Sequence, residues 1–216
     1  MPKSEIVEPK KKELSKPEPP KLNIAPSDIE ISKINLIQKS SQIEGPVGAF
    51  VLDQQHVIVE AGDEAPEVVI ISAHKGWREN IPYESDEMPR IAQTEEQKAA
   101  IEADSEFGTI EFADITMLIP KPGPQDEDDP TYPYPIGDEF FALGRSNGAK
   151  DAYRMTYKRL ATFTLFNSEL PVSHRLWTLK AEVMTKGKYS WFAPSLTITK
   201  NSPSKDVLNF VDRITS

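Results

Sequence analysis

The sequence predicts a mainly β protein with one or two helices, preceded by a disordered N-terminal tail. Twelve of its 19 prolines lie in two segments, residues 2–26 and 120–135, which indicates one tail and one long loop. Elsewhere, β-branched and alternating apolar runs dominate, as is typical of strands. One stretch, residues 149–166, has the period of an amphipathic helix. The length of 216 residues suits one domain or two small ones.

Several classes of protein are excluded by composition. The chain has no cysteine, which excludes disulfides, thiolate catalysis, zinc knuckles and iron–sulfur clusters. Its apolar runs are too short to cross a membrane, and its N-terminus lacks the apolar region of a secretory signal. We therefore expect a soluble cytoplasmic protein with no membrane partner.

The N-terminal elements follow in order. Residues 1–26 are rich in lysine, proline and glutamate without apolar periodicity, so we expect a disordered tail. We place the folded domain at residues 27–200, beginning with a short strand or extended clasp within 29–45. The β-branched runs at 49–60 and 67–74 predict two strands.

The middle of the domain combines a helix, strands and a loop. Thr94 and Gln97 have capping-box spacing, which predicts a helix over 94–103. Alternation over 112–119 predicts a strand, and 139–145 predicts another. Residues 121–135 should form a surface loop with an acidic centre at 126–129, because prolines interrupt strand pairing.

The clearest helix covers residues 149–166, with Ser146 or Asn147 as the N-cap. One broad face is apolar, and Lys150, Arg154 and Lys158 repeat every four residues on the opposite face. This face is a candidate phosphate-binding stripe.

A hairpin of residues 176–184 and 189–199 should end the domain, joined by a turn at 185–188. An even-length loop pairs odd with even positions, so Trp177 shares the apolar face with Phe192. Tyr189 and Trp191 then lie on the mixed polar face beside Lys180. Aromatic side chains ringed by lysines can stack on the bases of single-stranded nucleic acid. Alternatively, another layer of the protein covers this face.

This order of elements suits an OB-like five-stranded barrel, in which a helix lies between the third and fourth strands. Several α+β sandwich folds would have the same order of strands and helices. Residues 201–216 predict a C-terminal amphipathic helix or tail.

The formal charge of −9 is unevenly distributed. Residues 60–139 carry a net charge of −16, whereas residues 145–200 carry +7. A basic segment in an acidic chain can bind an anion, or it can simply pack against the acidic half.

Catalytic patterns are missing. The glycines form no phosphate-binding loop, and His56, His74 and His174 lack metal-ligand spacing. The acidic run at 126–129 is more typical of a solvated loop than of a two-metal site. We therefore expect a non-enzymatic protein with no cofactor and no metal.

Residues 72–79 follow a buried-looking strand and gather His74, Lys75, Trp77 and Arg78 around a glycine. We interpret them as a basic–aromatic loop, in which Trp77 stacks on a base while Lys75 and Arg78 contact phosphates. Alternatively, Trp77 plugs the end of the barrel.

The strand leading into residues 73–78, the Tyr153-Arg-x-x-x-Lys-Arg159 run and the tryptophan-bearing hairpin resemble a group of tailed-phage replication-region proteins. The resemblance covers residues 45–200. It implies an OB-like protein that binds single-stranded DNA during phage replication or recombination in the bacterial host cytoplasm. The chain departs from that pattern at its end, where a neutral helix replaces an acidic tail.

We therefore predict binding to single-stranded DNA largely without sequence preference. Phage or host replication proteins, or further copies of the chain, are candidate partners. The alternatives are a phage structural or assembly protein and a Mg²⁺-dependent nuclease using the acidic loop. The predicted nucleic-acid-binding residues are Lys75, Trp77, Arg78, Lys150, Arg154, Lys158, Lys180, Lys186, Lys188, Tyr189 and Trp191.

Overall fold

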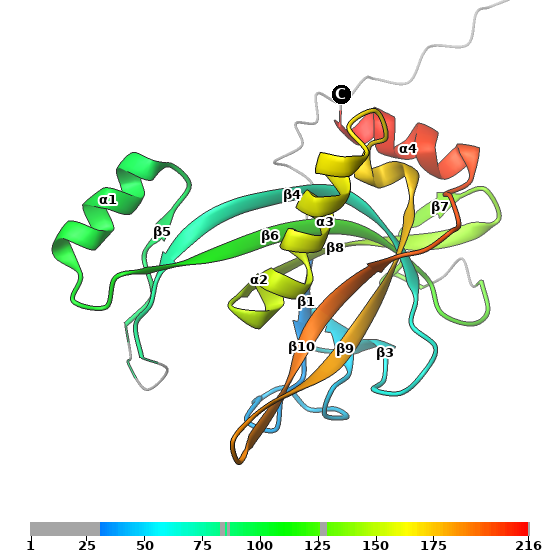
Figure 1. The fold of residues 1–216 in the computed structure, drawn as a ribbon. Helices are drawn as coiled ribbons and strands as arrows, with labels where there is room; N and C mark the ends of the chain where they lie inside the picture. Colours follow the sequence, from blue (N-terminus) through cyan, green and yellow to red (C-terminus); the bar gives the residue numbers. More distant parts are fainter. Residues whose placement is uncertain (1–30, 83–84, 86, 126–128, 216) are drawn as a thin grey trace, which may run out of the picture. The chain divides into compact units, whose positions relative to one another are not determined.

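The computed structural model describes residues 31–82, 85, 87–125 and 129–215, so the predicted tail at 1–26 and residues 126–128 of the acidic loop lie outside the described residues. The fold is mainly β, as predicted, with one sheet that curls into a half-barrel (Figure 1). The strands are β1 (Ser32–Leu36), β2 (Phe50–Leu52), β3 (His56–Val59), β4 (Glu67–Glu79), β5 (Ile91–Ala92), β6 (Thr109–Pro120), β7 (Tyr134–Ile136), β8 (Glu139–Ala149), β9 (Leu176–Lys186) and β10 (Tyr189–Ile198). The helices are α1 (Glu95–Asp104), α2 (Asp151–Met155), α3 (Tyr157–Phe166), a 3₁₀ turn η2 (Val172–His174) and α4 (Lys205–Thr215).

The described strands outnumber the five predicted, because several short strands extend the sheet. The main order is β10-β9-β4-β6-β8-β1-β2-β3, with β5 beside β4 and β7 beside β8. Neighbouring strands are antiparallel except for β1, which runs parallel to β8. The predicted strand at 49–60 is a small hairpin, because Asp53 and Gln54 adopt positive φ and reverse the chain.

The core lies inside the curl of the sheet. The predicted inward face of β6 is confirmed, since Ala113, Ile115, Met117 and Ile119 are all buried. Trp177, Leu179 and Leu196 of the C-terminal hairpin join the same cluster. Burial of these side chains on the concave face is the main force that holds the sheet curled.

The register of the β9–β10 hairpin agrees with the parity argument. Phe192 lies opposite Val183, and Trp191 lies opposite Met184. Trp177 therefore faces the core, and Trp191 faces the other side of the hairpin. The turn is tight because Gly187 adopts a φ of 60°.

The side-chain amide of Gln38, just after β1, bridges across the curl to β10, the terminal strand of the sheet. It donates to the carbonyl of Phe192 at 2.8 Å and accepts from its backbone N–H at 2.9 Å. One glutamine thus takes the place of a pairing strand along this part of β10.

The helices agree only in part with those predicted from the sequence. The capping box of Thr94 and Gln97 is confirmed in α1. The helix expected from 149 begins instead at Asp151, because β8 continues through Ala149 and keeps Ser146 and Asn147 in the sheet. It also breaks at Thr156 into α2 and α3.

Two predicted loops contain strand. Residues 72–79 are not a loop, since β4 continues through them and pairs with β6 as far as Glu79. Tyr134–Ile136 forms β7 despite Pro135, which is tolerated because β7 is an edge strand beside β8. The predicted C-terminal helix is confirmed in α4, where Phe210 packs against Tyr134 with ring centroids 5.7 Å apart.

Trp177 is the most deeply placed tryptophan, and its truncation tests the core. It is 1% exposed, its indole N–H donates to the carbonyl of Val172 at 3.0 Å, and its ring forms a T-shaped pair with that of Phe163. We expect Trp177→Ala to cost about 3–5 kcal/mol of unfolding free energy, measured by urea denaturation. The half-buried Trp191→Ala should cost less than half as much. Equal losses would show that both faces of the hairpin are equally covered.

Candidate nucleic-acid interface

The long strands β4 and β6 carry the site. Along their inner face, the core residue Ala113 is followed outward by Glu111, while Lys75 and Trp77 are their cross-strand partners on β4. At Glu111 this face borders a hollow that residues of α2 and α3 also line. The face that is apolar in the core therefore becomes charged and aromatic at its open end.

Trp77 lies between two lysines. The Nζ atom of Lys75 is 5.1 Å from the centroid of the indole ring, and Nζ of Lys98 on α1 is 5.3 Å from it. Both distances are within cation–π range. The half-buried ring is thus held in position by positive charges that can also contact phosphates.

Glu111 is the acidic member of this group. Its Oε1 accepts a hydrogen bond from Nζ of Lys75 at 2.5 Å. That hydrogen bond, helped by the positive charges of Lys75, Lys158 and Lys98, lowers the pKa of Glu111. The same hydrogen bond raises the pKa of Lys75, so the two groups form an ion pair at neutral pH.

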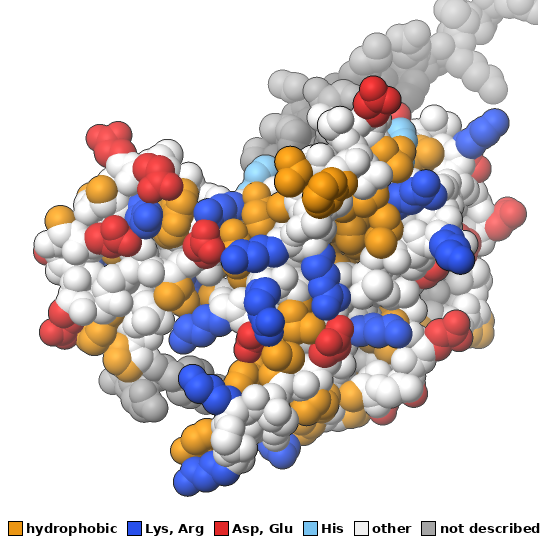
Figure 2. Space-filling model, viewed as in Figure 1, with side chains coloured by type: hydrophobic (Ala, Val, Ile, Leu, Met, Phe, Trp, Pro, Cys, Tyr) orange, Lys and Arg blue, Asp and Glu red, His pale blue; other side chains and the backbone are white. Residues whose placement is uncertain are grey.

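The helix pair adds the predicted basic stripe. Lys150, Arg154 and Lys158 line one hollow of about 340 Å³ together with Glu111 and Tyr153. Nζ of Lys158 lies 5.7 Å from the ring of Tyr153. Figure 2 shows lysine and arginine side chains gathered between the α1 lobe and the helices. We call this set the basic–aromatic cluster, composed of Lys75, Trp77, Lys98, Glu111, Lys150, Tyr153, Arg154 and Lys158.

An ion-pair network fixes α1, and with it Lys98, against β4. The Arg90 guanidinium donates to both carboxylate oxygens of Glu79 at 2.9 Å and to Asp104 at 2.6 Å. Hydrogen bonding to Arg90 lowers the pKa of Glu79 to about 2. Charge-assisted bidentate pairs of this kind orient the elements that carry them.

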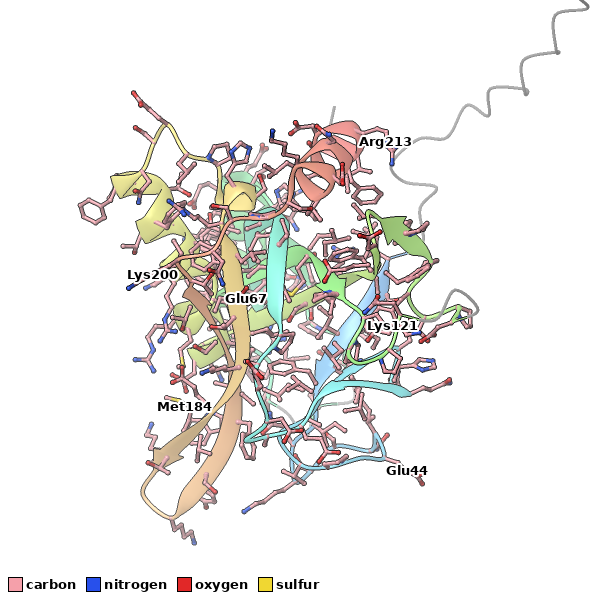
Figure 3. The ribbon with its side chains drawn as sticks, turned by 90° about the vertical axis from the view of Figure 1, so that its right-hand side faces the viewer. Glu44, Glu67, Lys121, Met184, Lys200 and Arg213 are labelled. Atoms are coloured by element: carbon pink, nitrogen blue, oxygen red, sulfur yellow. The ribbon has the colours of Figure 1, made fainter. Side chains whose placement is uncertain are left out.

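The predicted hairpin residues form a second group. Tyr189 is 67% exposed, and Nζ of Lys188 lies 5.4 Å from its ring. Trp191 is half-buried on the same face of the hairpin. In Figure 3, Met184 points to the side of the hairpin on which the helices lie. Near the base of that face, Arg159 of α3 donates to Ser195 Oγ at 2.6 Å, so this part is covered, as the alternative interpretation required.

The predicted residues are therefore only partly brought together. Five of them meet in the basic–aromatic cluster, namely Lys75, Trp77, Lys150, Arg154 and Lys158. Lys180, Lys186, Lys188, Tyr189 and Trp191 lie on the hairpin, and Lys180 pairs with Ser195 near the covered base. Arg78 lies on the opposite face of β4 from Lys75 and Trp77, so it cannot act with them.

Sequence reasoning missed Lys98, Glu111 and Tyr153. Glu111 shares the alternating period of Ala113 and Ile115, so the pattern that predicted the strand could have placed it. Tyr153 lies on the broad apolar face expected for residues 149–166, and it is 5% exposed, yet it also lines the hollow. No local pattern in the sequence marks Lys98, because it approaches Trp77 only once Arg90 has joined α1 to β4.

No protein-family model, curated protein or solved structure matches this chain. None of the described helices has the length and apolar character that crossing a bilayer requires. Among the described residues, no group of three or more histidine, aspartate or glutamate side chains is placed to hold a metal ion.

The Glu79–Arg90 pair predicts a specific acid sensitivity. Because the pKa of Glu79 falls from its ordinary 4.5 to about 2 on folding, its stabilisation is complete above pH 4.5 and is lost as the pH falls towards 2. The thermal midpoint of the wild type should fall more steeply over this range than that of Glu79→Gln, followed by circular dichroism. Glu106→Gln, an exposed change nearby, is the control and should follow the wild type. Parallel curves for wild type and Glu79→Gln would contradict the assignment.

Proposed function

We propose that the chain binds single-stranded DNA largely without sequence preference and catalyses no reaction. The observation that carries the proposal is the basic–aromatic cluster. In it, five cationic side chains lie around Trp77 and Tyr153, namely Lys75, Lys98, Lys150, Arg154 and Lys158. A positively charged surface with aromatic rings is the usual arrangement for binding single strands.

The chemistry divides between two kinds of contact. Ammonium and guanidinium groups meet phosphate oxygens, which are the same in every sequence. Trp77, and on the hairpin Tyr189 and Trp191, offer ring faces on which any base can stack. Neither kind of contact reads base edges, so the expected binding is weakly selective.

The topology supports an OB-like interpretation in part. The order β4, β6, β8, helix pair, β9 and β10 corresponds to five strands with a helix between the third and fourth. β9 returns to pair with β4, as that arrangement requires. The departure is at β8, which pairs with β1 where a closed barrel of this type would use the last strand.

The biological setting of the proposal comes from the resemblance to phage replication-region proteins. We propose accordingly that the chain acts in phage DNA replication or recombination in the bacterial cytoplasm. Replication proteins of the phage or host, and further copies of this chain, are the proposed partners.

The charge on the helix stripe predicts the salt dependence of binding. Replacing Lys150, Arg154 and Lys158 together by glutamine should reduce the slope of log affinity against log salt by about 2, at roughly 0.7 for each lost phosphate contact. The measurement is anisotropy of labelled oligo-dT over a salt series. The exposed set Lys39, Lys200 and Lys205, changed likewise, should leave the slope unchanged. If the two triple variants had equal salt slopes, the stripe would be a solvated helix face that makes no phosphate contact.

The aromatic rings should contribute binding affinity that does not depend on salt concentration. Trp77→Leu keeps an apolar side chain but removes the ring, so it should weaken oligo-dT binding by about 1–3 kcal/mol with little change in salt slope. Trp191→Leu should act in the same direction if its half-buried ring stacks on a base. Phe166→Leu is the control, because Phe166 is 78% exposed but lies outside the cluster. If Trp77→Leu bound oligo-dT with wild-type affinity, Trp77 would not be part of the binding site.

One observation favours the rival proposal of a structural or assembly protein. Leu165 and Phe166 at the end of α3 are 76% and 78% exposed, beside an apolar groove of about 520 Å³ that includes Phe163 and Ile198. A large stable assembly without oligonucleotide binding, seen by light scattering, would favour that function. Divalent-dependent degradation of the oligonucleotide would instead favour the nuclease.

A further inference from the structure

Glu111 places a negative charge inside the group of cations proposed to meet the DNA. The ammonium groups that influence it come from three separate elements: Lys75 on β4, Lys98 on α1 and Lys158 on α3. Its Oε1 accepts from Nζ of Lys75 at 2.5 Å, and its side chain is 42% exposed. A carboxylate that merely stabilised the strand pair would need one cationic partner, whereas this one lies in the field of three.

We propose that Lys75, Lys98 and Lys158 form a subsite for one phosphate of the strand, and that the carboxylate of Glu111 occupies this subsite in the free protein. The inference rests on the proposed function and adds a regulation to it. An incoming phosphate displaces Glu111 from Lys75, so Glu111 lowers the affinity of the protein for the strand.

The chemistry of the two anions makes this exchange reasonable. Carboxylate and phosphate oxygens both accept hydrogen bonds from an ammonium group, which is a donor in several directions. The side chains of Lys75 and Glu111 are 34% and 42% exposed, and ion pairs reached by solvent contribute little to stability. The internal pair can therefore open when a competing anion arrives.

The position of the subsite fits a strand that stacks on Trp77. Trp77 and Glu111 are direct cross-strand partners, so their side chains lie next to each other on one face. Lys75 and Lys98 both contact the indole ring. A nucleotide whose base stacks on Trp77 would thus bring its phosphate to Lys98 and to Lys75, the lysine that Glu111 neutralises in the free protein.

The test is Glu111→Gln, which keeps the size and the hydrogen-bond acceptor but removes the charge. Anisotropy of labelled oligo-dT over a salt series should show about fivefold tighter binding at low salt, equivalent to one unit-charge interaction about 4 Å away in water. The salt slope should steepen by about 0.7, because the variant leaves one more positive charge at the subsite without an internal counter-charge. Glu67→Gln is the matched control: it removes the same charge at the other end of β4, where Glu67 accepts from Asn201, and it should leave the slope unchanged.

A second variant separates a subsite from a general change of charge. In a Lys75→Gln background, the gain from Glu111→Gln should shrink, because the ammonium group that it frees is gone. A full gain in that background, or the same gain from Glu67→Gln, would overturn the subsite. If the wild type binds oligo-dT and Glu111→Gln binds no tighter, the inference fails and the proposed function stands. If wild type and Glu111→Gln both fail to bind, the proposed function fails and the inference falls with it.

Discussion

The continuous antiparallel pairing of β4 with β6 is the constraint on which the rest of this structure depends. The two strands stay in register from Val69 opposite Leu118 to Glu79 opposite Thr109, with one irregularity near Ile70. Their inner face supports the core at one end and carries Lys75, Trp77 and Glu111 of the basic–aromatic cluster at the other. The same alternation that buries Ala113 and Ile115 therefore places the half-buried Trp77 and Glu111 on the same face. The site therefore continues the same face of β4 and β6 that carries the core.

The charge asymmetry of the chain has a similar geometric origin. The Arg145–Asp114 pair joins the basic and acidic segments. Lys75, Arg90 and Lys98, however, pair with acidic neighbours within their own segment, and Arg154 and Arg159 do so within theirs. The basic segment is thus not simply neutralised by the acidic half, and its stripe on α2 and α3 faces the cations of β4 and α1. Positive charge from distant parts of the sequence gathers around two aromatic rings.

Local patterns in the sequence predicted the elements whose signals are local. Alternation placed the buried face of β6, parity placed Trp177 and Trp191 on opposite faces of the hairpin, and the capping box placed α1. The errors occurred where pairing between distant segments decides the structure. Ser146 and Asn147 look like helix caps, but β6 holds them in the sheet, and residues 72–79 look like a loop until their partners on β6 are known. Lys98 joins the site through Arg90, which no spacing in the sequence reveals.

The amide of Gln38 has a consequence for how the protein behaves in a crowded solution. A terminal strand with unpaired backbone groups is a template on which another chain can add a strand and begin to aggregate. Along the outer side of β10, Gln38 occupies both polar groups of Phe192, and Arg159 takes the carbonyl of Leu196. Between them, Pro194 points the same way by alternation and has no N–H to offer. The two polar groups of Phe192 and the carbonyl of Leu196 are thus occupied, and Pro194 offers no donor, so a foreign strand finds fewer hydrogen-bonding groups along this edge.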